Sequence, residues 1–86
     1  MTSRLAGAST VLDYFFDTLW PVKIKSAEFG EAGPGKIVFR IWFDTGQCVE
    51  VTASCGSVKG RPRETGERLE RSIMAQLEAY QMRMEL

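Results

Sequence analysis

The residue types that could do chemistry gather between Cys48 and Arg63. The segment "SCGS" (54–57) holds two hydroxyls and a thiol, the groups that serve as nucleophiles in covalent catalysis. Such a nucleophile needs a neighbouring base, and the sequence contains no histidine, the most common general base and metal ligand. We therefore expect no catalytic residues and no enzymatic activity.

The same region does not predict a metal or cofactor site. Cys48 and Cys55 are seven residues apart, a spacing that fits neither a CxxC motif nor a secreted disulfide framework. The basic stretch "GSVKGRPR" (56–63) could hold an anion, but it lacks the GxxxxGK[ST] spacing of a phosphate-binding loop. We expect no metal, no cofactor, and two reduced thiols packed as small apolar side chains.

Composition and charge are those of an ordinary globular domain. The 86 residues are 44% hydrophobic and 26% charged, which predicts a single domain over residues 1–86. Eleven basic residues balance eleven acidic ones, so general attraction to nucleic acid or to a membrane surface is not expected. No run reaches the ~20 apolar residues of a membrane helix, and Asp13 interrupts the apolar patch near the N-terminus. We expect a cytoplasmic protein with no membrane partner.

Three stretches of alternating apolar and polar residues predict β-strands. They are separated by "GEAGPG" (30–35) and "DTG" (44–46), which are rich in turn-forming residues. The predicted strands are 22–29, 36–43 and 47–54.

The second hairpin can be placed in register from the sequence. A three-residue loop over 44–46, with Gly46 in the left-handed conformation, puts Ile41 opposite Val49 on the apolar side. A two-residue loop would instead put Glu50 opposite Ile41. Burial therefore selects the three-residue loop.

Helical patterns flank the strands. The first helix begins at Thr10, which can cap it, or earlier near Ser3, and Pro21 ends it. Its predicted apolar stripe is Leu12, Phe15, Phe16 and Leu19. Residues 55–63 are expected to form a loop, and a second helix runs from about Glu64 to the end of the chain. Its apolar stripe is Leu69, Ile73, Leu77, Tyr80 and Met84.

These elements predict an α+β fold of two layers in the order α-β-β-β-α. The three strands form an antiparallel meander, and both helices cover its apolar face. The other face then has no cover from within the chain. Its expected members are Lys23, Lys25, Ala27, Lys36, Val38, Arg40, Trp42, Cys48, Glu50 and Thr52.

The uncovered face has three interpretations. It is an ordinary solvated face in which Arg40 pairs with Glu50, or it binds a partner. Tryptophan and arginine are enriched at interface hot spots, so the favoured function is protein–protein interaction, as an adaptor or a small inhibitor of the kind that phages and mobile elements encode. The predicted partner-binding residues are Lys23, Lys25, Lys36, Val38, Arg40 and Trp42.

The alternative function is nucleic-acid binding. Cations around one aromatic ring suit phosphate neutralisation and base stacking, and Lys59, Arg61 and Arg63 could add phosphate contacts. The order α-β-β-β-α resembles the layout of the double-stranded-RNA-binding domain, as does "AGPG" (32–35) between the first two strands. That family opens its last helix with lysines, whereas "RETGERLER" (63–71) alternates acidic and basic residues, so the likeness is one of layout.

The last helix also predicts self-association. Ile73, Leu77, Tyr80 and Met84 follow a 4-3-4 spacing that suits a helix-to-helix seam, and a small core gains from further burial. The same stripe could instead pack entirely on the sheet. We expect a homodimer.

Overall fold

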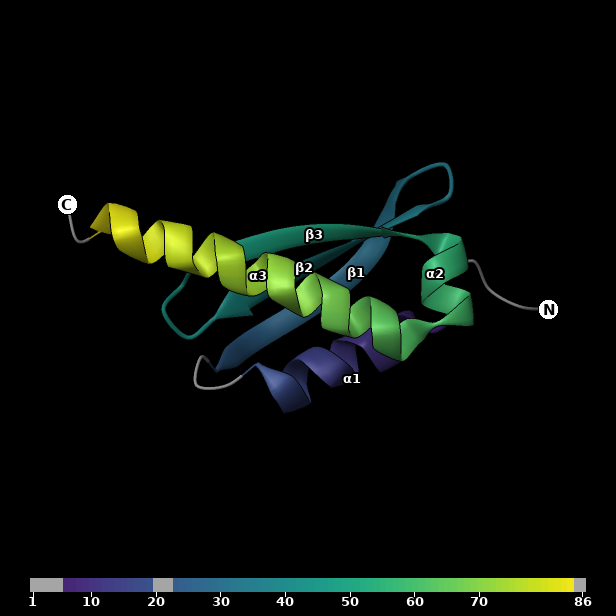
Figure 1. The fold of residues 1–86 in the computed structure, drawn as a ribbon, viewed down its shortest axis with the longest axis horizontal. Coiled ribbons are helices and arrows are strands. Elements are labelled where there is room, and N and C mark those ends of the chain that lie inside the picture. The colour runs from purple at the N-terminus through teal and green to yellow at the C-terminus, as the bar shows by residue number, and fades with distance from the viewer. Residues whose placement is uncertain (1–5, 20–22, 85–86) are drawn as a thin grey trace.

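A three-stranded antiparallel sheet in the order β1-β2-β3 packs against helices on one of its faces (Figure 1). The structure is a computed structural model, which describes residues 6–19 and 23–84, with side chains as far as Ala79. The elements are α1 (Ala8–Thr18), β1 (Ile24–Gly33), β2 (Lys36–Phe43), β3 (Cys48–Ser54), α2 (Cys55–Gly60) and α3 (Pro62–Met84). The predicted two-layer α+β fold is confirmed.

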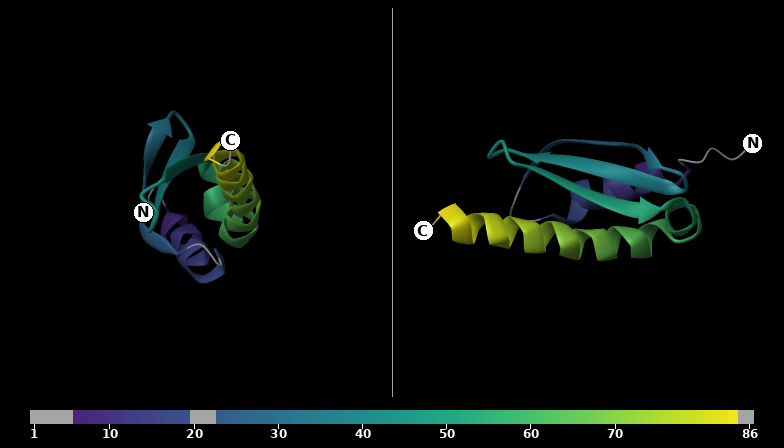
Figure 2. Two further views of the ribbon diagram at one scale, coloured as in Figure 1. Left: turned by 90° about the vertical axis from the view of Figure 1, so that its left-hand side faces the viewer. Right: turned by 90° about the horizontal axis from the view of Figure 1, so that it is seen from above.

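The core lies between the sheet and the helices. Strand β2 supplies its centre, with four fully buried side chains at alternate positions, Ile37, Phe39, Ile41 and Phe43. From α1, the Phe15 ring meets the Phe39 ring edge-on, with centroids 5.8 Å apart, a favourable geometry for two aromatic rings. Leu69, Ile73 and Leu77 of α3 are also buried. Figure 2 shows α3 lying along one side of the sheet.

The β2–β3 hairpin has the predicted register. Gly46 has a φ of 91°, and its N–H donates to the Phe43 carbonyl at 2.8 Å. The Phe43 N–H donates to the Gln47 carbonyl at 2.9 Å, and Ile41 pairs with Val49. The three-residue loop is therefore confirmed, and it keeps the charged residues of β3 off the core.

Strand β1 differs from the predicted strand because it contains a β-bulge. Ile24 pairs with Phe43, but Ser26 already pairs with Trp42, so Lys25 is an extra residue without a partner on β2. A one-residue insertion moves every later side chain of the strand to the opposite face of the sheet.

The bulge reverses the predicted faces of the rest of β1. Ala27 pairs with Ile41 and Phe29 pairs with Phe39, and both pack against the core. The prediction that Ala27 lies on the uncovered face was therefore wrong, and Glu28 lies there instead. The strand also runs on to Gly33, so only Pro34 and Gly35 form the turn. Val22, the first residue of the predicted strand, lies outside the described residues.

Helix α1 begins one turn earlier than Thr10. Its N-cap residue is Gly7, and Ala8 of the added turn is fully buried, so burial in the core accounts for the earlier start. Phe16 is 51% exposed, and its predicted place in the buried stripe was wrong. The helix ends at Thr18, while Ser3 and Pro21 lie outside the described residues.

Residues 55–60 form helix α2, so the loop predicted there was wrong. The Ser54 hydroxyl caps the helix by accepting the Ser57 N–H at 3.1 Å. Within the helix, the Val58 side chain is fully buried. Helix α3 then begins at Pro62, where the missing N–H of proline costs no hydrogen bond.

Candidate functional site

The face of the sheet turned away from the helices is not covered by any element among the described residues (Figure 2). We call it the open face. The strand registers place on it the side chains of alternate residues, which are Ser26, Glu28, Lys36, Val38, Arg40, Trp42, Cys48, Glu50, Thr52 and Ser54.

Arg40, at the centre of the open face, lies between two carboxylates. Its Nη1 is 3.4 Å from Glu28 Oε1, and its Nε is 3.4 Å from Glu50 Oε1. The hydrogen bond with Glu28 and the charge of Glu50 raise the pKa of the Arg40 guanidinium. The ion pair with Glu50 was predicted, whereas the one with Glu28 follows from the bulge. The centre of the open face therefore carries one cation against two carboxylates.

The structure separates the other predicted partner-binding residues. Lys36 lies six residues from Trp42 along β2, which is about 20 Å in a strand. Val38 is only 8% exposed and offers little surface to a partner. Lys23 precedes β1 and is exposed, with its carbonyl accepting the Asp44 N–H at 3.1 Å.

Lys25 and Trp42 are brought together. They line a hollow of about 280 Å³, with Ser26, Phe43 and Gly46 as its other lining residues. Trp42 is half-buried, and Lys25 is exposed in the bulge. Bulges often re-aim side chains beside functional sites. An indole wall with an ammonium group at its rim can receive an apolar side chain that is accompanied by a carboxylate.

The two thiols are not equivalent. Cys55 is half-buried and packs against the core as predicted, whereas Cys48 is exposed on the open face opposite Trp42. Burial, followed by the charge of Glu50, raises the pKa of the Cys48 thiol, so this thiol stays protonated at neutral pH and is a poor nucleophile. Among the described residues, no group of side chains could hold a metal ion.

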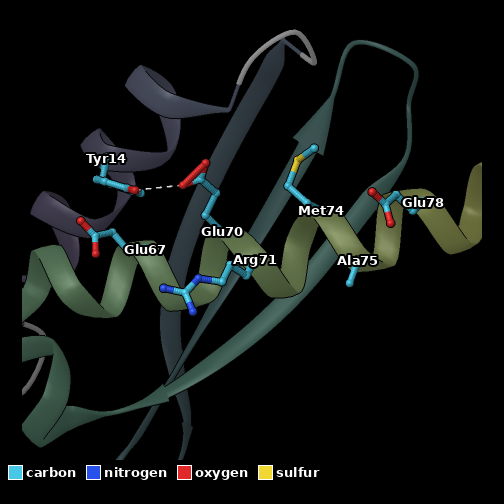
Figure 3. Close-up of a pocket in the computed structure, with 7 residues that line it drawn as sticks. All are labelled: Tyr14, Glu67, Glu70, Arg71, Met74, Ala75 and Glu78. Carbon is cyan, nitrogen blue, oxygen red and sulfur yellow. Dashed lines mark hydrogen bonds between the residues drawn. The ribbon is translucent and has the colours of Figure 1, made fainter.

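A second hollow, of about 440 Å³, lies between α1 and α3 (Figure 3). It is lined by Tyr14, Glu67, Glu70, Arg71, Met74, Ala75 and Glu78, so three carboxylates and one guanidinium contribute to its lining. The Tyr14 hydroxyl donates a hydrogen bond to Glu70 Oε2 at 2.9 Å and ties the two helices together. Sequence reasoning missed this hollow. The three- and four-residue spacing along α3 shows one helical face, but not that Tyr14 lies opposite it.

The Tyr14 hydroxyl should have a pKa above the ordinary value of a tyrosine. Burial, and then the hydrogen bond to Glu70, raise the pKa of Tyr14 above 10.0. Because the folded state favours the neutral phenol, this contribution to stability is present below pH 10 and is lost as the pH rises through the folded-state pKa. In a Tyr80→Phe background, tyrosinate absorbance should report the raised pKa of Tyr14. The further substitution Glu70→Gln should lower this pKa part of the way towards its ordinary value of 10.0. An unchanged pKa in Glu70→Gln would contradict the contact.

The residues predicted for self-association have different positions. Ile73 is fully buried and Leu77 is 6% exposed, and both pack in the core of the single chain. Tyr80 and Met84 belong to α3, but their side chains lie outside the described residues. The last turns of α3 project beyond the sheet (Figure 1). The described part of the stripe therefore packs on the sheet, and the homodimer stays a prediction.

The fold and its surfaces define a small α+β domain with a hollow beside Trp42 on the open face and another between α1 and α3. No known protein family, curated protein or solved structure matches the chain. Within residues 6–19 and 23–84, no helix has the length and apolar character needed to cross a membrane.

Proposed function

We propose that the protein is a small non-enzymatic binding module that acts through protein–protein interaction at the hollow beside Trp42. The observation that carries the proposal is a half-buried Trp42 in a hollow, on a sheet face that no described element covers. Tryptophan is among the residue types most enriched at hot spots, and a hollow that already exists needs little rearrangement on binding.

The lining of the hollow supports one kind of partner. Trp42 offers apolar contact, and Lys25 offers a positive charge. A partner segment that carries an apolar side chain next to an aspartate or glutamate matches both features. An adaptor and a small inhibitor of the kind that phages and mobile elements encode would both work in this way, by occupying a surface of the partner.

We place the protein in the cytoplasm, where its two free cysteines stay reduced. Nucleic-acid binding has less support than protein binding. Arg40 is already paired with Glu28 and Glu50, so a phosphate would have to compete with two carboxylates for it.

Trp42→Ala should weaken partner binding by about 30-fold or more, which corresponds to the ~2 kcal/mol loss of a hot-spot residue. The partner is first isolated by affinity capture from the native host, and binding of the purified pair is then measured by calorimetry. Phe16→Ala is the matched control, because it removes an exposed aromatic side chain from α1, away from the open face. Phe16→Ala should bind as the unchanged protein does.

Equal affinity of Trp42→Ala and the unchanged protein, with both folded by circular dichroism, would contradict the proposal. Titration with mixed-sequence oligonucleotides at low salt tests the nucleic-acid alternative through Trp42 fluorescence, in a Trp20→Phe background. We expect no quenching up to ~100 µM oligonucleotide. Ordinary non-specific nucleic-acid binding has dissociation constants at or below about this concentration. Quenching whose affinity falls steeply with salt would favour the nucleic-acid alternative.

A further inference from the structure

The outer edge of β1 carries backbone groups that have no partner in the described part of the chain. The Phe43 N–H donates to β3, so the alternate residues of β2, including Arg40, turn their backbone groups toward β1. Glu28, which pairs with Arg40, therefore points its N–H and C=O inward. Ala27, Phe29 and Glu31 point theirs outward, and no backbone hydrogen bond from a described residue reaches them.

The opposite edge of the sheet is protected. Helix α3 packs against β3, and Gln76 Nε2 donates to the Glu50 carbonyl on that edge at 3.4 Å. Free edges are usually blunted by lysine, proline or a bulge. In β1 the irregularities lie near Lys25 and Ala32, and the regular stretch 26–31 between them contains neither lysine nor proline. The middle of β1 is therefore open to another strand.

We propose that this edge pairs with β1 of a second copy of the chain, antiparallel, about a two-fold axis through Phe29. The two three-stranded sheets then join into one sheet of six strands. At the axis, Phe29 meets Phe29 of the second copy, which buries more of two half-exposed rings. Aromatic pairs directly across two strands are favourable.

Charge and regularity select this axis over its neighbours. An axis through Glu28 or Glu31 would place a carboxylate directly against its own copy, which is unfavourable. An axis through Ala27 or Gly30 would run the pairing into the irregularities near Lys25 or Ala32. With the axis at Phe29, Glu28 faces Gly30 of the second copy and Glu31 faces Ala27 of the second copy. No like charges are then directly opposite each other.

Gly30 provides a matched pair of variants. A Cβ at Gly30 would meet no atom within 4 Å, so a side chain there fits the single chain. In the paired sheet, Gly30→Glu puts a carboxylate opposite Glu28 of the second copy, whereas Gly30→Lys puts a cation there. Because symmetry repeats each contact, the dimer dissociation constant should be about tenfold weaker for Gly30→Glu than for Gly30→Lys.

Sedimentation equilibrium from low to high micromolar concentration gives the dissociation constants, and amide exchange locates the contact. We expect reversible dimers, and the Phe29 and Glu31 amides should exchange more slowly as the dimeric fraction rises with protein concentration. Ala27→Pro removes only an outward N–H, so it should leave a folded monomer. A monomer at every concentration, equal constants for the two Gly30 variants, or a dimer in which the Phe29 amide exchanges as fast as in the monomer would each overturn the proposal.

Discussion

Phe39→Ala should lower the free energy of unfolding by about 3–5 kcal/mol, the usual cost of removing a buried phenylalanine ring. Phe39 is fully buried at the centre of β2. Its ring meets Phe15 edge-on at 5.8 Å and Phe29 at 6.4 Å, so the cavity left by alanine would be lined on two sides by rings. A loss of this size is a large part of the ~5–15 kcal/mol that holds an ordinary domain together.

Urea unfolding followed by circular dichroism measures this loss. Phe16→Ala is the control, since it deletes the same side chain from a position that is 51% exposed. We expect Phe16→Ala to stay within about 0.5 kcal/mol of the unchanged protein. Similar losses in the two variants would contradict the placement of the core between β2 and α1.

The β2–β3 hairpin shows what local sequence can predict. The segment "DTG" (44–46) supplies a glycine where the loop needs a left-handed residue, and the alternation on both sides allows one register that buries Ile41 and Val49 together. Turn chemistry and burial pointed to the same answer, and the register was confirmed.

The face of β1 was not predicted, although the sequence carries a signal for it. Ile24 is at an even position, whereas Ala27 and Phe29 are at odd positions, so the apolar alternation changes phase within the strand. Such a change requires an extra residue, which the structure places at Lys25. The bulge brings Glu28 to Arg40 and Lys25 to the hollow beside Trp42.

Helix α2 and the hollow between α1 and α3 depend on contacts that local patterns do not contain. Helix α2 has only six residues and is held by the Ser54 cap and the buried Val58. The hollow needs Tyr14 to lie beside Glu70, which is 56 residues away in the sequence. Tertiary packing decides both features, and no spacing within one segment predicts them.

The two proposals act together. Pairing of β1 strands would place two copies of the open face side by side, each with a hollow at Trp42. A partner with two matching segments would then bind more tightly than either hollow alone allows, because the second contact becomes intramolecular. The Gly30 variants change the pairing, whereas Trp42→Ala changes the hollow, so the two effects can be measured separately.

Gly7→Ala should cost clearly more stability than Gly46→Ala, and the difference measures how closely α1 approaches α2. Both glycines have a left-handed backbone, with φ of 88° and 91°, so alanine adds strain of about 1–2 kcal/mol at either position. A Cβ at Gly46 would meet no atom within 4 Å, whereas one at Gly7 would overlap the Val58 carbonyl oxygen.

That oxygen belongs to the backbone of α2 and cannot turn aside as a side chain can, and the Val58 side chain is fully buried. Helices α1 and α2 must therefore separate to admit the new methyl group, which adds a further ~1–3 kcal/mol, the usual cost of overpacking. Urea unfolding of the two variants gives the comparison, and amide exchange in α2 should quicken only in Gly7→Ala. Equal losses in the two variants would show that strain alone is responsible and that α1 and α2 are not in contact at Gly7.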